Sequence, residues 1–280
     1  MHPQPHISII VAVYNRAATL QRCIDSVGSQ DYPCKELIVI DGGSTDGSVD
    51  ILWQNDHLID YWESEPDRGI YHAWNKGLEH ATGDWIHFLG ADDYFMDSEV
   101  LAEVAKGIGH CSADIRIVYG KEAVVSTDGE VLEVRGDPWQ KAGPKFIQEM
   151  SIPHPAVFHY RRIFDDHGRF DESFRICADY ELLLRELKNG QACFLSDLIV
   201  KGVSYGGASK QWDMILTVVT ETARARERNG IFPYGPSWIW FYCKTFVKYW
   251  LARLVGDRIT RHAVDLYRLL TGRPRIWSKM

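Results

Sequence analysis

The sequence predicts an α/β fold in which helices flank a mostly parallel β-sheet, followed by a helical C-terminal extension. Two patterns support this prediction. Short apolar runs rich in β-branched residues alternate with stretches of helical periodicity over residues 7–89, as in a sheet whose strands are joined by crossover helices. The loops that carry acids and glycines all follow strands, so they should meet at the ligand-binding edge of the sheet.

The first strand expected is Ile7–Val13, because its unbroken apolar run is typical of a buried parallel strand. A helix follows, with apolar residues at helical spacing between positions 20 and 27. The remaining elements of this half are a strand at 37–40, a helix at 48–54, a strand at 58–62, a helix at 70–81 and a strand at 85–89.

Beyond residue 93 the alternation becomes less regular. A Thr-Asp-Gly sequence at 127–129 predicts the turn of a hairpin. The elements expected in this half are a helix at 100–108, a strand at 115–119, a hairpin at 123–134, a loop at 136–144, a strand at 156–160, a helix at 182–187 and a long helix at 209–229.

Two adjacent acids, Asp92 and Asp93, directly follow the strand at 85–89. Neighbouring carboxylates suit a hard divalent cation and the phosphates that it bridges. Aspartates also turn chains and cap helices, so this stretch alone leaves both interpretations open. Asp179 comes at the expected start of a helix, where the positive end of the helix dipole stabilises a carboxylate, and a plain N-cap is the alternative role.

Composition limits the classes of function. The net charge of −7 gives no general reason to expect nucleic-acid binding. Neither a G-x-G-x-x-G nor a G-x-x-x-x-G-K-S/T loop is present, and the first residues do not form a signal peptide. The six cysteines lack C-x-x-C spacing, which predicts reduced, mostly buried thiols of a cytosolic protein, with no zinc site and no disulfide.

A series of motifs over residues 7–209 resembles family-2 glycosyltransferases with the GT-A fold, in particular those of bacterial surface-polysaccharide clusters. The blocks that carry the resemblance are VAVYN (11–15), DGGSTDG (41–47), EPDRGIYHAWNKG (65–77), ATGDWIHFL (81–89), ADD (91–93), FDE (170–172), ADYEL (178–182) and YGGAS (205–209). Their order and spacing make the match specific.

The resemblance implies a role for each matching residue. Asp93 would bind Mg²⁺ or Mn²⁺, and Asp179 would be the general base of an inverting transfer. Arg68 and Lys76 are candidate diphosphate contacts, or else solvated surface charges. The residues implied to bind the nucleotide itself are Val13, Tyr14, Asn15 and Asp41 at the base and Asp92 at the ribose.

Three positions need separate comment. Gly90 stands where the family often has an acid, which leaves Asp93 as the one expected side-chain ligand of the metal. Ala178 replaces a usual acid, so Asp179 is the one carboxylate expected directly at the base position. His154 either lines the acceptor site or packs beneath it.

The expected enzyme moves a sugar from a UDP- or GDP-linked donor to a glycan or a polyprenyl-diphosphate-linked acceptor. The predicted domains are a catalytic domain at 1–209, divided into a nucleotide-sugar half (about 1–95) and an acceptor half (about 96–209), and an extension at 210–280. The alternatives are a nucleotidyltransferase and a catalytically silent nucleotide-sugar-binding or membrane scaffold protein. The first would need a basic, glycine-rich loop near the first strand, and the sequence at 11–18 has none.

The C-terminal segment differs from the rest in charge. Residues 236–280 contain nine Lys or Arg against two Asp, so they carry +7 and the remainder −14. The aromatic stretch at 238–255 is interrupted by three cations, which argues against a spanning helix. It favours a helix that lies on the inner face of the cytoplasmic membrane. The alternative is packing against the catalytic domain or a second subunit, as in a homo-oligomer.

Overall fold

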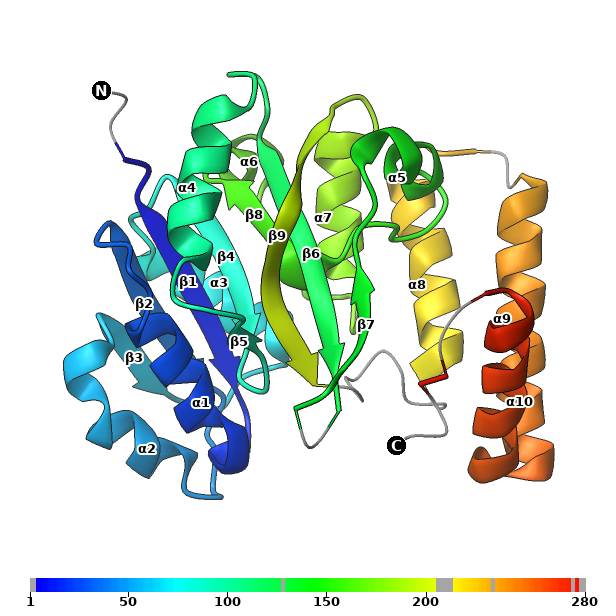
Figure 1. Ribbon diagram of the computed structural model, residues 1–280, viewed down its shortest axis with the longest axis horizontal. Helices are drawn as coiled ribbons and strands as arrows, with labels where there is room; N and C mark the ends of the chain where they lie inside the picture. Colours follow the sequence, from blue (N-terminus) through cyan, green and yellow to red (C-terminus); the bar gives the residue numbers. More distant parts are fainter. Residues whose placement is uncertain (1–3, 127–128, 205–213, 233–234, 273–274, 277–280) are drawn as a thin grey trace.

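The computed structural model describes residues 4–126, 129–204, 214–232, 235–272 and 275–276. The described residues form a nine-stranded sheet in the order β3-β2-β1-β4-β8-β6-β9-β5, with β7 paired to β6 (Figure 1). The strands are β1 (Ile7–Val13), β2 (Lys35–Asp41), β3 (Tyr61–Ser64), β4 (Trp85–Gly90), β5 (Tyr94–Phe95), β6 (Ile117–Val125), β7 (Val131–Arg135), β8 (Val157–Tyr160) and β9 (Ala192–Ser204).

Helices cover both faces of this sheet. Alternate residues of β1 point to opposite sides, so that Ile10 packs with α3 and Ile9 with α1 and α4. The helices are α1 (Ala17–Gly28), α2 (Ser48–Gln54), α3 (Ile70–His80), α4 (Val100–His110), α5 (Trp139–Phe146), α6 (Arg162–His167), α7 (Ala178–Leu187), α8 (Ile215–Arg228), α9 (Pro236–Val255) and α10 (Asp257–Leu270). The expected α/β fold is therefore confirmed.

The parallel part of the sheet is its first half, where β3, β2, β1 and β4 all run in the same direction. Their carboxyl ends bring the acidic and glycine-rich loops to one edge, as predicted. The second half is mixed: β8 is antiparallel to both β4 and β6, whereas β6 and β9 are parallel. The short strand β5 returns to pair with the end of β9, which places residue 95 opposite Lys201.

Several predicted boundaries need correction. The loop expected at 136–144 contains α5, which begins after Pro138 and has Pro144 near its end. The strand β9 was not predicted, because polar residues at 196 and 197 interrupt its apolar pattern. Of the helix expected at 209–229, the described part begins at residue 215, and the YGGAS block at 205–209 lies outside the described residues.

The prediction that the chain lacks a disulfide is wrong for one pair of cysteines. Cys111, at the end of α4, is bonded to Cys193 in β9. The two positions are 82 residues apart, so their proximity depends on the sheet order and could not be read from local spacing. Cys23 and Cys177 are buried free thiols, as expected, whereas Cys34 is partly exposed and Cys243 exposed.

The last two helices stand side by side at one end of the molecule (Figure 1). The side chain of Arg268 in α10 donates to Glu133 Oε1 of β7 at 2.6 Å, which connects the pair to the sheet. Within the described ranges, no helix is both long and apolar enough to cross a bilayer.

Candidate functional site

A cavity of about 680 Å³ opens at the carboxyl ends of β1, β2 and β4. Three residues expected to bind the nucleotide, Val13, Tyr14 and Asp92, line it. Tyr14 is 63% exposed, which is unusual for a large aromatic side chain and leaves its ring available to a ligand. The other residues that line the cavity are Ala12, Arg16, Gly42, Gly43, Pro66, Asp67, Gly69, Ile70, Gly90 and Ala91.

Asn15 joins the two loops at the base of this cavity. Its side-chain Oδ1 accepts a hydrogen bond from Thr45 N at 2.9 Å, and its own N–H donates to Ser44 Oγ at 2.7 Å. Its φ of 50° lies in the left-handed region, which asparagine tolerates better than most residues. Asn15 therefore fixes the shape of the loop that presents Tyr14.

Asp41 is fully buried beneath the loop that follows β2. Its carboxylate accepts hydrogen bonds from the backbone N–H groups of residues 43 and 44 and from the hydroxyls of Ser44 and Ser64. Three of these bonds reach Oδ2, whereas Oδ1 accepts one, from the Ser44 hydroxyl, so Asp41 holds the loop after β2 in place.

A second acid, Asp67, faces the cavity from the loop between β3 and α3. It packs directly against Gly42: a Cβ added to that glycine would lie 2.6 Å from Asp67 Oδ2. The other oxygen, Oδ1, accepts from Gly69 N at 2.8 Å. Sequence reasoning included Asp67 in a motif block and gave it no role.

The adjacent acids after β4 have different environments. Asp92 lines the cavity, whereas Asp93 is 8% exposed and its Oδ2 lies 2.7 Å from Lys201 Nζ. Lys201 is itself 1% exposed, so the two charges form a buried ion pair. Burial raises the pKa of Asp93, and the Lys201 ammonium works against that rise. Sequence reasoning missed Lys201, although a lysine within an apolar strand was a usable signal.

The ion pair with Lys201 makes Asp93 less available as a metal ligand, because the ammonium group already contacts one of its two carboxylate oxygens. Over the described residues, no cluster of three or more His, Cys, Asp or Glu side chains could hold an ion. Of the two adjacent acids after β4, Asp92 is the one that lines the cavity. One carboxylate with phosphate and water ligands is a donor set that Mg²⁺ accepts, so a metal fits here through Asp92.

The two cations expected at a diphosphate both have acidic partners. Arg68 pairs with Glu172, and its side chain is 70% exposed. Lys76 pairs with Glu63 and lies 3.8 Å from Glu65. Neither lines the cavity. Arg68 crosses from the loop before α3 to the loop before α7, whereas Lys76 connects α3 to β3.

Asp179 lies in the first turn of α7, beside the first turn of α3. Ile70 of α3 lines the cavity, and the next residue, Tyr71, places its hydroxyl 3.3 Å from Asp179 Oδ1. His154 Nδ1 is 3.7 Å from the other oxygen, Oδ2. Burial raises the pKa of Asp179 to about 6 and lowers that of His154 well below its usual value. At neutral pH, a carboxylate with a pKa about one unit below the pH therefore lies beside an uncharged imidazole.

The start of α7 is held in place from α8. The carboxylate of Glu221 accepts hydrogen bonds from the backbone N–H groups of residues 175, 176 and 177, at 2.7–3.0 Å. Three charge-assisted bonds from consecutive amides fix the backbone immediately before Asp179. Glu221, for which no sequence pattern indicated a role, is therefore a positioning residue of this site.

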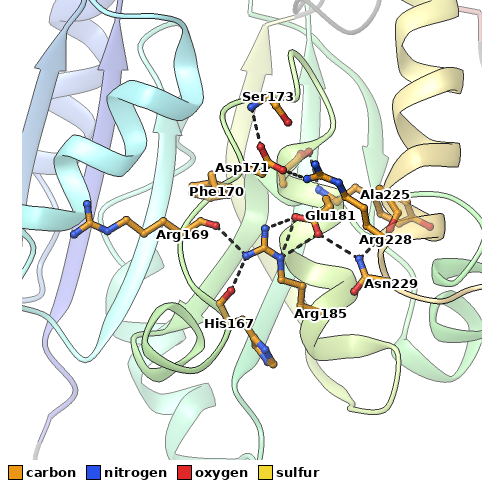
Figure 2. A network of polar contacts seen from close by, with 12 residues as sticks. His167, Arg169, Phe170, Asp171, Ser173, Glu181, Arg185, Ala225, Arg228 and Asn229 are labelled. Atoms are coloured by element: carbon orange, nitrogen blue, oxygen red, sulfur yellow. Dashed lines mark hydrogen bonds and ion pairs between the residues drawn. The ribbon is translucent and has the colours of Figure 1, made fainter.

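A polar network also fixes α7 further along its length (Figure 2). Arg185 pairs with Glu181 and donates to the backbone carbonyls of His167 and Arg169, at 2.7 and 3.0 Å. Arg228 of α8 pairs with Asp171 in the same loop. These contacts join α7, α8 and the loop at 167–173, which contains the FDE block, into one rigid support for Asp179.

The family model for "Glycosyl transferase family 2" matches residues 8–161. A "PGL/p-HBAD biosynthesis glycosyltransferase" of Mycobacterium tuberculosis is 35% identical over 193 residues, which cover 66% of this chain and 71% of the relative. The chondroitin synthase of Pasteurella multocida is 27% identical over 216 residues, covering 74% of this chain and 21% of that protein.

Solved structures show the same fold at lower identity. TarS of S. aureus (residues 1–349), in complex with UDP-GlcNAc, has a TM-score of 0.60 and 18% identity, covering 77% of this chain and 66% of that one. In a longer TarS structure the matched part is 39% of the chain. The mannosyltransferase PcManGT from Pyrobaculum calidifontis, in complex with GDP-Man and Mn²⁺, has a TM-score of 0.61 and 16% identity. The match covers 97% of this chain and 80% of that one.

Proposed function

Because the chain belongs to glycosyltransferase family 2, we propose that it catalyses an inverting, metal-dependent sugar transfer in cell-surface glycan synthesis. The donor is a UDP- or GDP-linked sugar, and the acceptor is a glycan or a polyprenyl-diphosphate-linked sugar. The observation that carries the proposal is Asp179, a carboxylate with a raised pKa beside a cavity at the sheet edge. The complexes of TarS with UDP-GlcNAc and of PcManGT with GDP-Man support a nucleotide-sugar donor.

In this proposal the cavity receives the nucleotide. The exposed ring of Tyr14 stacks on the base, and Val13 and Asn15 shape the wall around it. Asp41 acts indirectly, by holding the loop after β2. The start of α3, at Gly69 and Ile70, lines the cavity, and a helix N-terminus there is suited to the diphosphate.

Mg²⁺ or Mn²⁺ would be held by Asp92, and it would neutralise charge on the departing nucleoside diphosphate. Asp93 was the expected ligand, but its pairing with Lys201 favours a role in orienting the turn that carries Asp92. Arg68 is the better placed of the two candidate diphosphate cations, because its exposed guanidinium can exchange Glu172 for a phosphate. Lys76 is held by Glu63 and supports α3.

The proton is handled by Asp179. Its carboxylate accepts the proton of the acceptor hydroxyl as that oxygen attacks the anomeric carbon from the side opposite the leaving group, which inverts the configuration. The backbone N–H of Tyr180 orients the carboxylate, and His154 stays neutral, so it adds no positive charge that would lower the basicity of Asp179.

A thermal-shift screen tests the donor. With Mn²⁺ present, a UDP- or GDP-sugar at about 100 times its dissociation constant is expected to raise the melting temperature by several degrees, since ligand binding then stabilises the native state by about 2.7 kcal/mol. A nucleotide-free sugar phosphate is the control. A nucleotidyltransferase would instead respond to a nucleoside triphosphate, and a response to triphosphates alone would contradict the proposal.

The raised pKa of Asp179 sets the expected pH dependence. The base acts in its deprotonated form, so kcat/KM should fall about tenfold per unit below pH 6, rather than below the ordinary carboxyl value near 4. The profile is measured with saturating metal between pH 5 and 8. A rate that stays constant down to pH 5 would exclude Asp179 as the base.

The extension supports a peripheral site on the inner face of the cytoplasmic membrane. Trp240, Val247 and Leu254 follow at seven-residue intervals on one side of α9, each at least 63% exposed. Arg253 and Arg258 are exposed nearby, which suits an anionic surface. Because Glu221 joins α8 to the site, we place the boundary of the extension nearer residue 235 than residue 209.

We expect the wild-type chain to sediment with vesicles of anionic lipid and the triple variant Trp240→Glu, Val247→Glu, Leu254→Glu to stay in the supernatant. Trp53→Glu is the matched control, because Trp53 is 66% exposed on α2, outside the extension. If the triple variant still binds vesicles, or instead dissociates a dimer of the wild-type chain, the apolar side of α9 serves another role.

A further inference from the structure

The disulfide between Cys111 and Cys193 takes no part in the proposed reaction. We infer that this bond is a reversible redox site: glutathione opens and re-forms it by thiol–disulfide exchange, and the open form holds the acidic turn at 91–93 less firmly. The inference goes beyond the proposed function, because it concerns the scaffold of the sheet and does not depend on which ligand the cavity takes.

The bond attaches the end of α4 to β9. Cys111 directly follows α4, and Cys193 is the second residue of β9. The strand β5, which precedes α4 in the chain, pairs with β9 near its other end. Between these two connections α4 packs closely on β9, since a Cβ on Gly107 would lie 2.5 Å from Leu195 Cδ2. Opening the disulfide therefore releases one of the two ends of the β5–α4 unit from β9.

The same strand reaches the acidic turn. Lys201 of β9 pairs with Asp93, and the backbone N–H of Met96, directly after β5, donates to the carbonyl of Val200 at 3.3 Å. Asp92, which lines the cavity, is the residue before Asp93. The attachment of β5 and α4 to β9 thus fixes the position of this turn, so a looser attachment of α4 increases the motion of the turn.

Both cysteines can be reached from the surface. Each is half-buried, and each lines a different cavity: Cys111 lines one of about 730 Å³ and Cys193 one of about 540 Å³. Exposed disulfides are the ones that small thiols reduce readily, whereas fully buried cysteines are inert. This exposure favours a reversible bond over a permanent one.

The charges around the two sulfurs differ, and they indicate which sulfur glutathione attacks. One carboxylate and one ammonium, those of Asp31 and Lys106, line the cavity at Cys111. The cavity at Cys193 also has Lys106 and His110, but four carboxylates line it: Asp97, Glu99, Glu103 and Asp197. Glutathione carries a net negative charge, so the more acidic cavity repels it. Attack is therefore expected at Cys111.

The exchange is balanced over two steps. A glutathione thiolate attacks the sulfur of Cys111, the protein S–S bond breaks, and Cys193 leaves as a thiolate that takes a proton from water. A second glutathione thiolate attacks the mixed disulfide, which releases glutathione disulfide and the Cys111 thiolate, and this thiolate is protonated in turn. The protein is reduced by two electrons while two glutathione molecules are oxidised. Glutathione disulfide drives the same steps in reverse.

The first test measures the state of the bond in the folded wild-type protein. Samples equilibrated with reduced or oxidised glutathione are alkylated and analysed by mass spectrometry. Cys111 and Cys193 should be alkylated after reduced glutathione and protected after oxidised glutathione. Cys243, an exposed free thiol, is the control for access of the alkylating reagent. A bond that stays closed in reduced glutathione, or two thiols that are still alkylated after oxidised glutathione, would overturn the inference.

Single variants test the expected site of attack. Cys193→Ser leaves Cys111 as a free thiol, and Cys111→Ser leaves Cys193. With oxidised glutathione, Cys111 in the first variant should react at least about tenfold faster than Cys193 in the second, as followed by mass spectrometry of each peptide. With dithiodipyridine, which is uncharged, the ratio of the two rates should be smaller. Equal rates with oxidised glutathione, or the same ratio with both reagents, would contradict attack at Cys111.

Hydrogen exchange measures the effect on the acidic turn. In reduced wild-type protein, the amides of Met96 and of the last turn of α4 should exchange at least about tenfold faster than in the oxidised protein. The amides of α7, which packs on the opposite face of the sheet from α4, are the control and should change little. This comparison needs no variant, so it does not depend on a variant folding. Faster exchange in α4 without a change at Met96 would show that the bond holds α4 alone, and would overturn its effect on the turn.

Discussion

An Asp179→Asn variant is expected to lose about 10²- to 10⁴-fold in kcat, the contribution typical of a general base. Asparagine keeps the size of the side chain and an oxygen that can accept the bond from Tyr180 N, now 2.8 Å from Asp179 Oδ1. The amide cannot take a proton from the acceptor. Initial rates with a nucleotide sugar and metal measure the loss, and calorimetry measures donor binding.

The donor affinity of this variant distinguishes a catalytic role of Asp179 from a structural one. It should stay within about twofold of the wild-type value, because Asp179 is not among the residues that line the cavity. Asp165→Asn, the same substitution at an exposed position of α6, is the control. A wild-type rate in Asp179→Asn would remove the assignment as base, and a collapse of donor binding would make Asp179 a structural residue.

The second large effect is on stability. Lys201→Met is expected to lower the free energy of unfolding by about 3–5 kcal/mol, the usual result of removing one partner of a buried ion pair. The Asp93 carboxylate would remain 8% exposed, without its ammonium. Urea denaturation followed by circular dichroism gives the difference in free energy.

A double variant provides the control. In Lys201→Met/Asp93→Asn both charges are gone, so much of the lost stability should return, and the difference from the sum of the single variants gives the coupling between them. If Lys201→Met costs less than about 1 kcal/mol, water already solvates Asp93 and the ion pair is not a buried anchor.

The sequence was most informative where structure is local. The strand Ile7–Val13 and the helix at 48–54 have the bounds predicted for them, because an unbroken apolar run and a helical period are each visible within one segment. The strand β9 was missed for the opposite reason. Its polar interruption is tolerated because the register with β6 shifts there, a fact of pairing between distant segments.

The same limit applies to the site. The strand pattern predicted that Tyr14 and Asp92 lie at one edge of the sheet, because the carboxyl ends of parallel strands meet there, and both line the same cavity. It could not show that Asp41 is engaged by its own loop, that Lys201 reaches Asp93, or that Glu221 holds the start of α7. Each of these depends on side chains that contact one another across the fold.

The buried pair of Asp93 and Lys201 also bears on how such sites evolve. The two positions are 108 residues apart, yet a substitution at either one alone leaves an uncompensated charge inside the protein. A lineage should therefore change both together or neither, so positions 93 and 201 are expected to covary among homologues. Where a homologue has a neutral residue at position 201, the acid at position 93 has no ammonium partner there and becomes a candidate metal ligand.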